Sequence, residues 1–409
     1  MDLSQIRGLD EPIRLHDSQS RPKQLLETSS GAYAAVSPDV VRLLRKLRAG
    51  QTYAEIAEEV SRSSGSKVEE SQVREAADKV FRQLRAIEDK EVAPPGFLFR
   101  LPLLSAPVVR SISSRLTFLF HPLVALACLM LIGAALWGSV QPYRIHQIFE
   151  IPMTASNFWK GFLILLLTMV IHEFGHASAS IRYGAKPSEI GFTLFLIFPA
   201  FYSDVTSSWE LPRLRRVIVD VSGLYFQLIC GSLLLFAYLQ WGWEPLWVAW
   251  ILILGSALFM LNPILRFDGY WMIADALGVA NLRAQTRRIA LHLWNRLRSR
   301  PVKPLPWPPH VLVGISLYSA MAVAAWVYFL TFIVPLVGAY LAKYPEVVLK
   351  FWNDLMGDSP VVDIQPILVS TYLTLALTLL TYRIIRWLTT TLVQTVRARW
   401  MTQGGMEKA

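Results

Sequence analysis

An uncharged run of eleven residues, 161–171, leads directly into the sequence His172-Glu173-Phe-Gly-His176. Positions i and i+4 of a helix share one face, so both imidazoles can reach one metal ion while Glu173 lies beside them. At 1.5 Å per residue, His172 lies about 18 Å along the helix from Lys160, past the middle of a bilayer core about 30 Å thick. Ionisable groups at that depth are costly unless they pair, ligate or line a wet cavity. The pattern therefore predicts a membrane-crossing helix that carries a functional metal site.

The composition indicates a membrane protein with a soluble part. Of the 409 residues, 53% are hydrophobic and 17% are charged, which is too apolar for an ordinary soluble protein. The two cysteines, Cys128 and Cys230, lie in apolar stretches, so neither a disulfide framework nor a thiolate zinc site is available. The metal ligands must then be histidine and carboxylate side chains. The first 100 residues carry charges throughout, so we expect no signal peptide and a cytoplasmic N-terminus.

The N-terminal region begins with a predicted pair of short strands, 24–27 and 33–36, on either side of a turn. A serine and a proline follow at positions 37 and 38, which is the pattern of an N-cap with proline in the first helical turn. Gly50 ends this first predicted helix.

Two further helices are predicted after Gly50. Thr52 and Glu55 form a capping box that opens the second helix. The third helix has apolar residues at three- and four-residue spacing between Val73 and Ile87. Together with the strands, this pattern predicts that residues 1–92 form a small α+β domain of the winged-helix type.

The distribution of charge bears on the partner of this domain. Residues 1–95 hold almost equal numbers of basic and acidic side chains, so the net charge of +10 belongs to the rest of the chain. A nucleic-acid role then lacks its electrostatic basis, and we expect no nucleic-acid partner.

Two stretches of this domain carry a family resemblance, namely Glu27-Thr-Ser-Ser-Gly-Ala-Tyr-Ala-Ala-Val-Ser-Pro-Asp39 and Leu47-Arg-Ala-Gly-Gln-Thr-Tyr-Ala-Glu-Ile56. They resemble the PqqD-like domain, which recognises the leader peptides of ribosomally synthesised, modified peptides. In that family the peptide adds as an extra strand to the sheet edge beside the third helix, so the resemblance implies a precursor peptide as partner. The alternative is a generic dimerisation or tethering domain.

The rest of the chain predicts a helical polytopic membrane protein with about six spans. The spans are expected at 117–137, 158–180, 217–240, 246–264, 311–334 and 364–382. This arrangement makes 93–116 an interfacial linker, 117–400 the transmembrane domain with its core at 158–275, and 401–409 a cytoplasmic tail.

Residues 190–202 are apolar but too few to cross a bilayer as a straight helix, and they contain a proline. They predict an interfacial or re-entrant hairpin, since non-helical backbone at that depth must lie against protein or a cavity. A loop packed on the bundle surface is the alternative.

Basic residues give the orientation of the spans. They gather before the first and third spans, in the stretch 283–303 between the fourth and fifth spans, and after the sixth span, and the positive-inside rule makes this side cytoplasmic. We therefore expect a multi-pass protein of the bacterial cytoplasmic (inner) membrane, with both termini in the cytoplasm and the loop 337–363 on the opposite side. The basic residues concerned are Arg110, Arg115, Arg213, Arg215, Arg216, Arg383, Arg386, Arg397 and Arg399, with seven more from Arg283 to Lys303.

A third metal ligand is predicted at the end of the fourth span. A catalytic zinc typically takes three protein ligands and a water. Pro263 and Gly269 bracket a broken helix end, which would let Asp268 turn back toward the motif helix. A solvated aspartate paired with Arg266 is the alternative.

The motif His172-Glu-Phe-Gly-His176 with Pro263-x-x-x-x-Asp268-Gly resembles the site-2 protease family, the M50-type intramembrane zinc metalloproteases, over residues 158–275. The stretch Phe-Pro-Ala-Phe-Tyr-Ser-Asp-Val at 198–205 is closest to the peptide zinc metalloprotease branch of that family. The resemblance implies one Zn²⁺ per chain, held by His172, His176 and Asp268, with Glu173 as the catalytic base of peptide-bond hydrolysis.

Three positions depart from the family pattern or have no assigned role. Asn262 directly precedes Pro263, and Gln227 stands where many members have an asparagine, so the polar substrate-holding roles of the family do not carry over. Asp220 is an intramembrane acid for which we expect a hydrogen bond to a neighbouring helix.

Three functions follow from these patterns. The first is a protease that processes a ribosomally synthesised modified peptide docked by residues 1–92. The second is regulated proteolysis of a membrane-anchored signalling protein. The third is a non-catalytic peptide export or immunity component, against which the complete set of two histidines, a glutamate and an aspartate argues.

Overall fold

The structure is a computed structural model that describes most of the chain between residues 24 and 356. The described residues are 24–28, 33–88, 98–141, 154–195, 198–262, 266–279, 282–299, 304–305, 307–328, 331 and 334–356, with residues 6, 9, 13, 14, 371, 374, 375, 378, 382, 386 and 389. The predicted tail 401–409 and Pro263 lie outside this set, as does most of the predicted sixth span.

The N-terminal region contains the predicted strand pair, which belongs to a three-stranded antiparallel sheet. Strands β1 (Ile13–Arg14), β2 (Gln24–Glu27) and β3 (Tyr33–Val36) pair in the order β1-β2-β3. Gln24 lies opposite Val36 and Glu27 lies opposite Tyr33. The bounds of the two predicted strands are confirmed.

Three helices follow the sheet: α1 (Pro38–Arg48), α2 (Tyr53–Ser64) and α3 (Glu70–Glu88). Their caps form as the sequence predicts. Ser37 accepts a hydrogen bond from the backbone N–H of Val40, and Thr52 and Glu55 exchange hydrogen bonds of 3.3 and 2.7 Å. The main core of this α+β unit contains the buried side chains of Leu26, Ala34, Val41, Leu44 and Leu84.

Among the described residues, three helices are long and apolar enough to cross a membrane. They are α5 (Pro122–Ser139), α7 (Ala155–Tyr183), counted from Ser156, and α8 (Arg213–Trp241). The fourth and fifth predicted spans correspond to α9 (Glu244–Met260) and α12 (Pro309–Tyr328), whose apolar parts are shorter. The first span begins later than predicted, because residues 117–120 form a 3₁₀ turn and Pro122 opens the helix.

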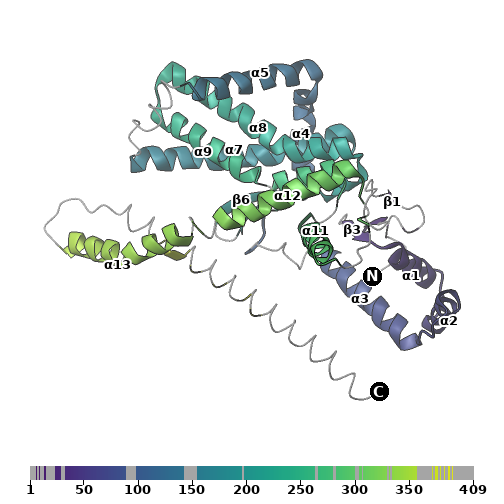
Figure 1. The fold of residues 1–409 in the computed structure, drawn as a ribbon. Coiled ribbons are helices and arrows are strands. Elements are labelled where there is room, and N and C mark those ends of the chain that lie inside the picture. Colours follow the sequence, from purple (N-terminus) through teal and green to yellow (C-terminus); the bar gives the residue numbers. More distant parts are fainter. Residues whose placement is uncertain are drawn as a thin grey trace. The chain divides into compact units, whose positions relative to one another are not determined.

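Helices α5, α7, α8 and α9 pack side by side (Figure 1). A tryptophan of α9 connects this group: Trp250 is fully buried, and its Nε1 donates a hydrogen bond of 2.8 Å to Ser139 Oγ of α5. Leu235 of α8 is buried in the same cluster. The metal motif therefore lies on a helix that is supported on several sides by protein.

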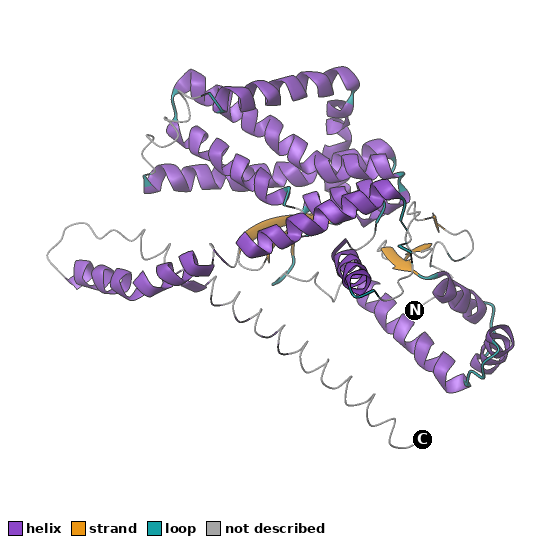
Figure 2. Ribbon diagram, in the orientation of Figure 1, coloured by secondary structure: helices purple, strands orange, loops and turns teal. Residues whose placement is uncertain are grey.

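A second small sheet accompanies these helices (Figure 2), so the predicted transmembrane domain is not purely helical, although the sequence suggests a purely helical one. Strands β4 (Leu101–Leu104), β5 (Ile190–Phe195) and β6 (Phe198–Ser203) pair in the order β4-β5-β6. The predicted hairpin at 190–202 is thus a β-hairpin; its depth in a membrane stays a prediction. The described part of the predicted linker 93–116 is ordered as β4 and α4 (Ala106–Leu116).

The C-terminal described part consists of α10 (Asp268–Leu277), α11 (Leu282–Leu297), α12 and α13 (Val334–Met356). The segment 337–363, expected as the connection on the non-cytoplasmic side, is helical up to Met356 as part of α13, and its side of the membrane stays a prediction. Lys343, Glu346 and Lys350 are spaced three and four residues apart, which places them on one face of this helix.

Candidate metal centre

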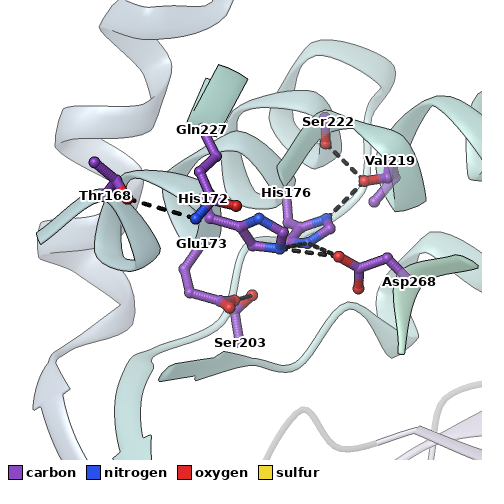
Figure 3. Close-up of polar contacts among 9 residues, drawn as sticks. All are labelled: Thr168, His172, Glu173, His176, Ser203, Val219, Ser222, Gln227 and Asp268. Atoms are coloured by element: carbon purple, nitrogen blue, oxygen red, sulfur yellow. Dashed lines mark hydrogen bonds and ion pairs between the residues drawn. The ribbon is translucent and has the colours of Figure 1, made fainter. Parts of the chain in front are cut away.

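The motif residues occupy one face of α7 near its C-terminal third. His172, Glu173 and His176 are all buried, with 5%, 8% and 5% of their surface exposed. The Nε2 atoms of the two histidines lie 3.0 Å apart (Figure 3). The i, i+4 spacing therefore brings the two imidazoles together as predicted.

Asp268 joins the histidines from a different element. It is the first residue of α10, and its Oδ2 lies 2.9 Å from His172 Nε2 and 3.5 Å from His176 Nε2. Its side chain is 25% exposed. The predicted break between α9 and α10 thus turns this carboxylate toward the motif helix. Interpretation of Asp268 as a metal ligand requires this placement, whereas interpretation as a solvated aspartate does not require it.

The hydrogen bonds of His176 leave one ring nitrogen free to act as a ligand. Its Nδ1 lies 2.7 Å from the backbone carbonyl oxygen of Val219 on α8. A carbonyl oxygen can only accept, so in the neutral imidazole Nδ1 carries the proton and Nε2 presents its lone pair. Ser222 Oγ donates to the same carbonyl at 2.6 Å. The orientation of His176 is thereby set by the backbone of α8.

The separations of the three candidate ligand atoms fit a single zinc ion. A tetrahedral zinc with nitrogen and oxygen ligands at about 2.1 Å holds those atoms about 3.4 Å apart. The observed separations between Nε2 of His172, Nε2 of His176 and Oδ2 of Asp268 are 2.9, 3.0 and 3.5 Å. Asp268 Oδ2 is buried and faces the Nε2 atoms of both imidazoles, as an atom that shares an ion with them would. No other group of three metal-ligating side chains was found in the described part of the chain.

Gly223 of α8 leaves the space that an ion would need. A Cβ at this position would lie 2.5 Å from His172 Nε2 and would be equally close to His176 Nε2. Any larger residue would therefore fill the space in front of both nitrogens. This role of Gly223 was not predicted, although a glycine inside a long helix costs about 1 kcal/mol relative to alanine and so indicates a packing or functional reason.

Glu173 is held by a residue of the second sheet. Ser203, the last residue of β6, donates a hydrogen bond of 2.5 Å from Oγ to Oε2 of Glu173. Ser203 was not predicted as a site residue, because nothing in its local sequence indicates that the end of a hairpin contacts the motif helix.

Two other polar residues of α8 lie close to this centre. The side-chain amide of Gln227 donates to Thr168 Oγ1 at 3.4 Å. Asp220 is 5% exposed, and its Oδ2 has no hydrogen-bond partner among the described residues. The predicted hydrogen bond from Asp220 to a neighbouring helix is therefore not found for that oxygen.

Two imidazoles and a carboxylate around one point, with a glutamate beside them, are an arrangement that mononuclear hydrolytic zinc centres use. Over 127 residues, the chain is 33% identical to a protein of Bacillus subtilis (strain 168) named "Putative peptide zinc metalloprotease protein YydH". The aligned part covers 30% of this chain and 50% of that protein, so the chain spans about half the length of this relative. No protein-family model and no solved structure matches the chain.

Proposed function

We propose that this chain is an intramembrane zinc metalloprotease of the site-2 type that hydrolyses peptide bonds. The observation that carries the proposal is that His172, His176 and Asp268 lie close enough to one another to bind one ion, with Glu173 beside them. The partial similarity to a protein named as a peptide zinc metalloprotease supports it. The apolar helices α5, α7 and α8 support a membrane location.

One Zn²⁺ held by His172, His176 and Asp268 would supply a Lewis acid that activates water and polarises the scissile carbonyl. Glu173 follows His172 in the chain and accepts the proton of the attacking water as general base. Val219 keeps the proton of His176 on Nδ1, away from the centre. The burial of all three motif residues limits competing access of bulk water.

The substrate must reach this centre in an extended form, because peptide bonds inside a helix are shielded. Strand β6 is at the end of the order β4-β5-β6, and its last residue contacts Glu173. A peptide that adds to β6 by main-chain hydrogen bonds would therefore run toward the catalytic base.

The N-terminal domain is proposed to dock the precursor of a ribosomally synthesised, modified peptide. Strand β3 stands at the end of the order β1-β2-β3, and helix α3 contacts it. An extended leader peptide could add to β3 beside α3, as the PqqD-like resemblance implies.

Metal analysis of the purified full-length protein tests the centre. We expect one zinc per chain in the wild type and loss of zinc in His172→Ala, while His310→Ala, which alters an exposed histidine, keeps it. Glu173→Gln should keep zinc and abolish peptide hydrolysis, because it removes only the base. An unchanged zinc content in His172→Ala contradicts the assignment of the ligands.

Deletion of residues 1–92 tests the docking role. We expect a higher KM for a precursor peptide encoded near this gene and an unchanged zinc content, because docking and chemistry occupy separate parts of the chain. An unchanged KM would contradict leader docking, and binding of residues 1–92 to duplex DNA with a steep salt dependence would favour the signalling alternative.

A further inference from the structure

The third ligand depends on how a short helix is held. Asp268 is the first residue of α10, which has ten residues and is therefore about 15 Å long. The ligand atoms of a zinc site must lie within about 0.2 Å of their proper distances. A small rotation of α10 would thus move Asp268 Oδ2 out of reach of the ion.

An ion pair fixes the other end of α10 to α8. Arg216 Nε lies 3.3 Å from Asp275 Oδ1, and the two side chains are 3% and 17% exposed. Asp275 follows Asp268 by seven residues, which is almost two helical turns, so the two carboxylates lie on the same side of α10. The side of α10 that presents the ligand is therefore the side that is held.

A second arginine of α8 meets the C-terminus of the same helix. Gly278 caps α10 in the left-handed conformation with φ of +65°, and any Cβ there would collide with the guanidinium of Arg213. The C-terminal end of a helix carries partial negative charge, which a guanidinium stabilises. Arg213 thus lies where it secures the end of α10.

Helix α8 also orients one of the two histidines. Val219 of α8, three residues after Arg216, is the residue whose carbonyl accepts from His176 Nδ1. One short stretch of α8 therefore contacts both the element that carries Asp268 and the side chain of His176. This common support determines the separation of the ligands contributed by α7 and α10.

We propose that Arg216 and Asp275 are positioning residues for the metal centre, which hold Asp268 at ligand distance from the two histidines. The inference rests on the proposed function, because it takes Asp268 as the third zinc ligand. Arg216 was expected only as one of the cytoplasmic basic residues. It is 2% exposed, whereas the neighbouring Arg215 is exposed.

A buried ion pair of this kind fixes the position of a helix more than it adds to the free energy of unfolding. The cost of removing two charges from water offsets most of their attraction, and apolar replacements of both partners are often neutral for stability. A variant without either charge can therefore keep the fold while it loses the constraint on α10.

The experiment uses the full-length protein with Arg216→Met, Asp275→Leu, the double variant of both, and Arg215→Met as the matched control. Zinc dissociation constants are measured by competition with a chelator. Thermal unfolding is measured on the zinc-free proteins, and the absorption spectrum on the Co²⁺-substituted ones. If either single variant fails to fold, the double variant still tests the proposal.

We expect the double variant to bind zinc ten- to a hundred-fold more weakly than the wild type, in the range found for residues that orient ligands. Its Co²⁺ spectrum should change, its zinc-free unfolding temperature should stay near that of the wild type, and Arg215→Met should match the wild type throughout. Wild-type zinc affinity in the double variant would overturn this inference and leave the proposed function intact. A weaker affinity that only accompanies a large loss of zinc-free stability overturns it too, since the pair would then be a general structural contact. If the wild type itself binds no zinc, the proposed function fails.

Discussion

Ser203 Oγ donates a hydrogen bond of 2.5 Å to Oε2 of Glu173 and so connects the end of strand β6 to the motif helix. A carboxylate that accepts such a bond has a defined rotamer, which a base needs in order to meet its substrate proton. Because β6 is also the strand that an extended substrate could join, binding of the substrate and orientation of the base involve one element.

Replacement of Ser203 by alanine should lower kcat by roughly ten- to a hundred-fold, because a hydrogen bond to a charged group contributes about 1.5–3 kcal/mol and each 1.4 kcal/mol is tenfold in rate. Zinc content should not change. Ser203→Thr, which keeps the hydroxyl, should retain most of the rate, and Ser232→Ala, which alters a serine of helix α8, should have no effect. An unchanged kcat in Ser203→Ala would show that this bond does not orient the base.

An alanine at position 223 should abolish zinc binding. The added Cβ would lie 2.5 Å from His172 Nε2, so either the imidazoles move apart or the methyl group occupies the space of the ion. Gly255 of α9 offers a matched control, because nothing lies within 4 Å of a Cβ there. Both substitutions raise helix propensity by about 1 kcal/mol. Full zinc occupancy in Gly223→Ala, measured by elemental analysis, would contradict the placement of the metal.

Removal of zinc should lower the thermal unfolding temperature of the full-length protein. A ligand that binds only the folded state stabilises it by about 2.7 kcal/mol at a hundred times its dissociation constant. Chelator should therefore lower the unfolding temperature of the wild type and of His310→Ala, but not that of Asp268→Ala. An equal response of Asp268→Ala would mean that the chelated metal is bound elsewhere.

The carboxyl of Glu59 should titrate below its ordinary pKa of 4.5, because the Lys46 ammonium donates a hydrogen bond to it at 2.5 Å and lowers its pKa. A carboxyl whose pKa is lowered by folding contributes stability above its unfolded pKa and loses that contribution as the pH falls through the folded value. The Lys46–Glu59 contribution should thus be complete above pH 4.5 and decline below it.

Carbon NMR of labelled glutamate carboxyls measures this pKa directly. Lys46→Met should raise the pKa of Glu59, whereas Lys67→Met, which removes an exposed lysine of the same domain, should not. Equal values in both variants would contradict the pairing.

Local chemistry made parts of this fold predictable. The capping box of Thr52 and Glu55 involves residues three positions apart, and so does the cap that Ser37 provides. The pairing of His172 and His176 needs only the helical repeat. The approach of Asp268 to the motif helix was predicted from the helix break between Pro263 and Gly269, and its role as a ligand from the resemblance to the site-2 protease family.

The contacts that the sequence did not reveal join elements far apart in the chain. Ser203 meets Glu173 across thirty residues, and Arg216 meets Asp275 across fifty-nine. Strand β4 has the sequence Leu-Pro-Leu-Leu, which lacks the alternation of a half-buried strand, and only its pairing with β5 makes it one. Such contacts depend on the tertiary arrangement, which no local periodicity encodes.

Helix α7 has 29 residues and is therefore about 43 Å long, which exceeds the apolar thickness of a bilayer by about 13 Å. In a bilayer, a helix of this length would tilt or extend beyond the apolar layer, and each response costs little energy. His172 lies about 26 Å from the start of the helix. In a membrane, its distance from the nearest headgroups would thus depend on the lipid as well as on the chain. The length of the surrounding acyl chains would therefore help to determine how readily water reaches the buried histidines.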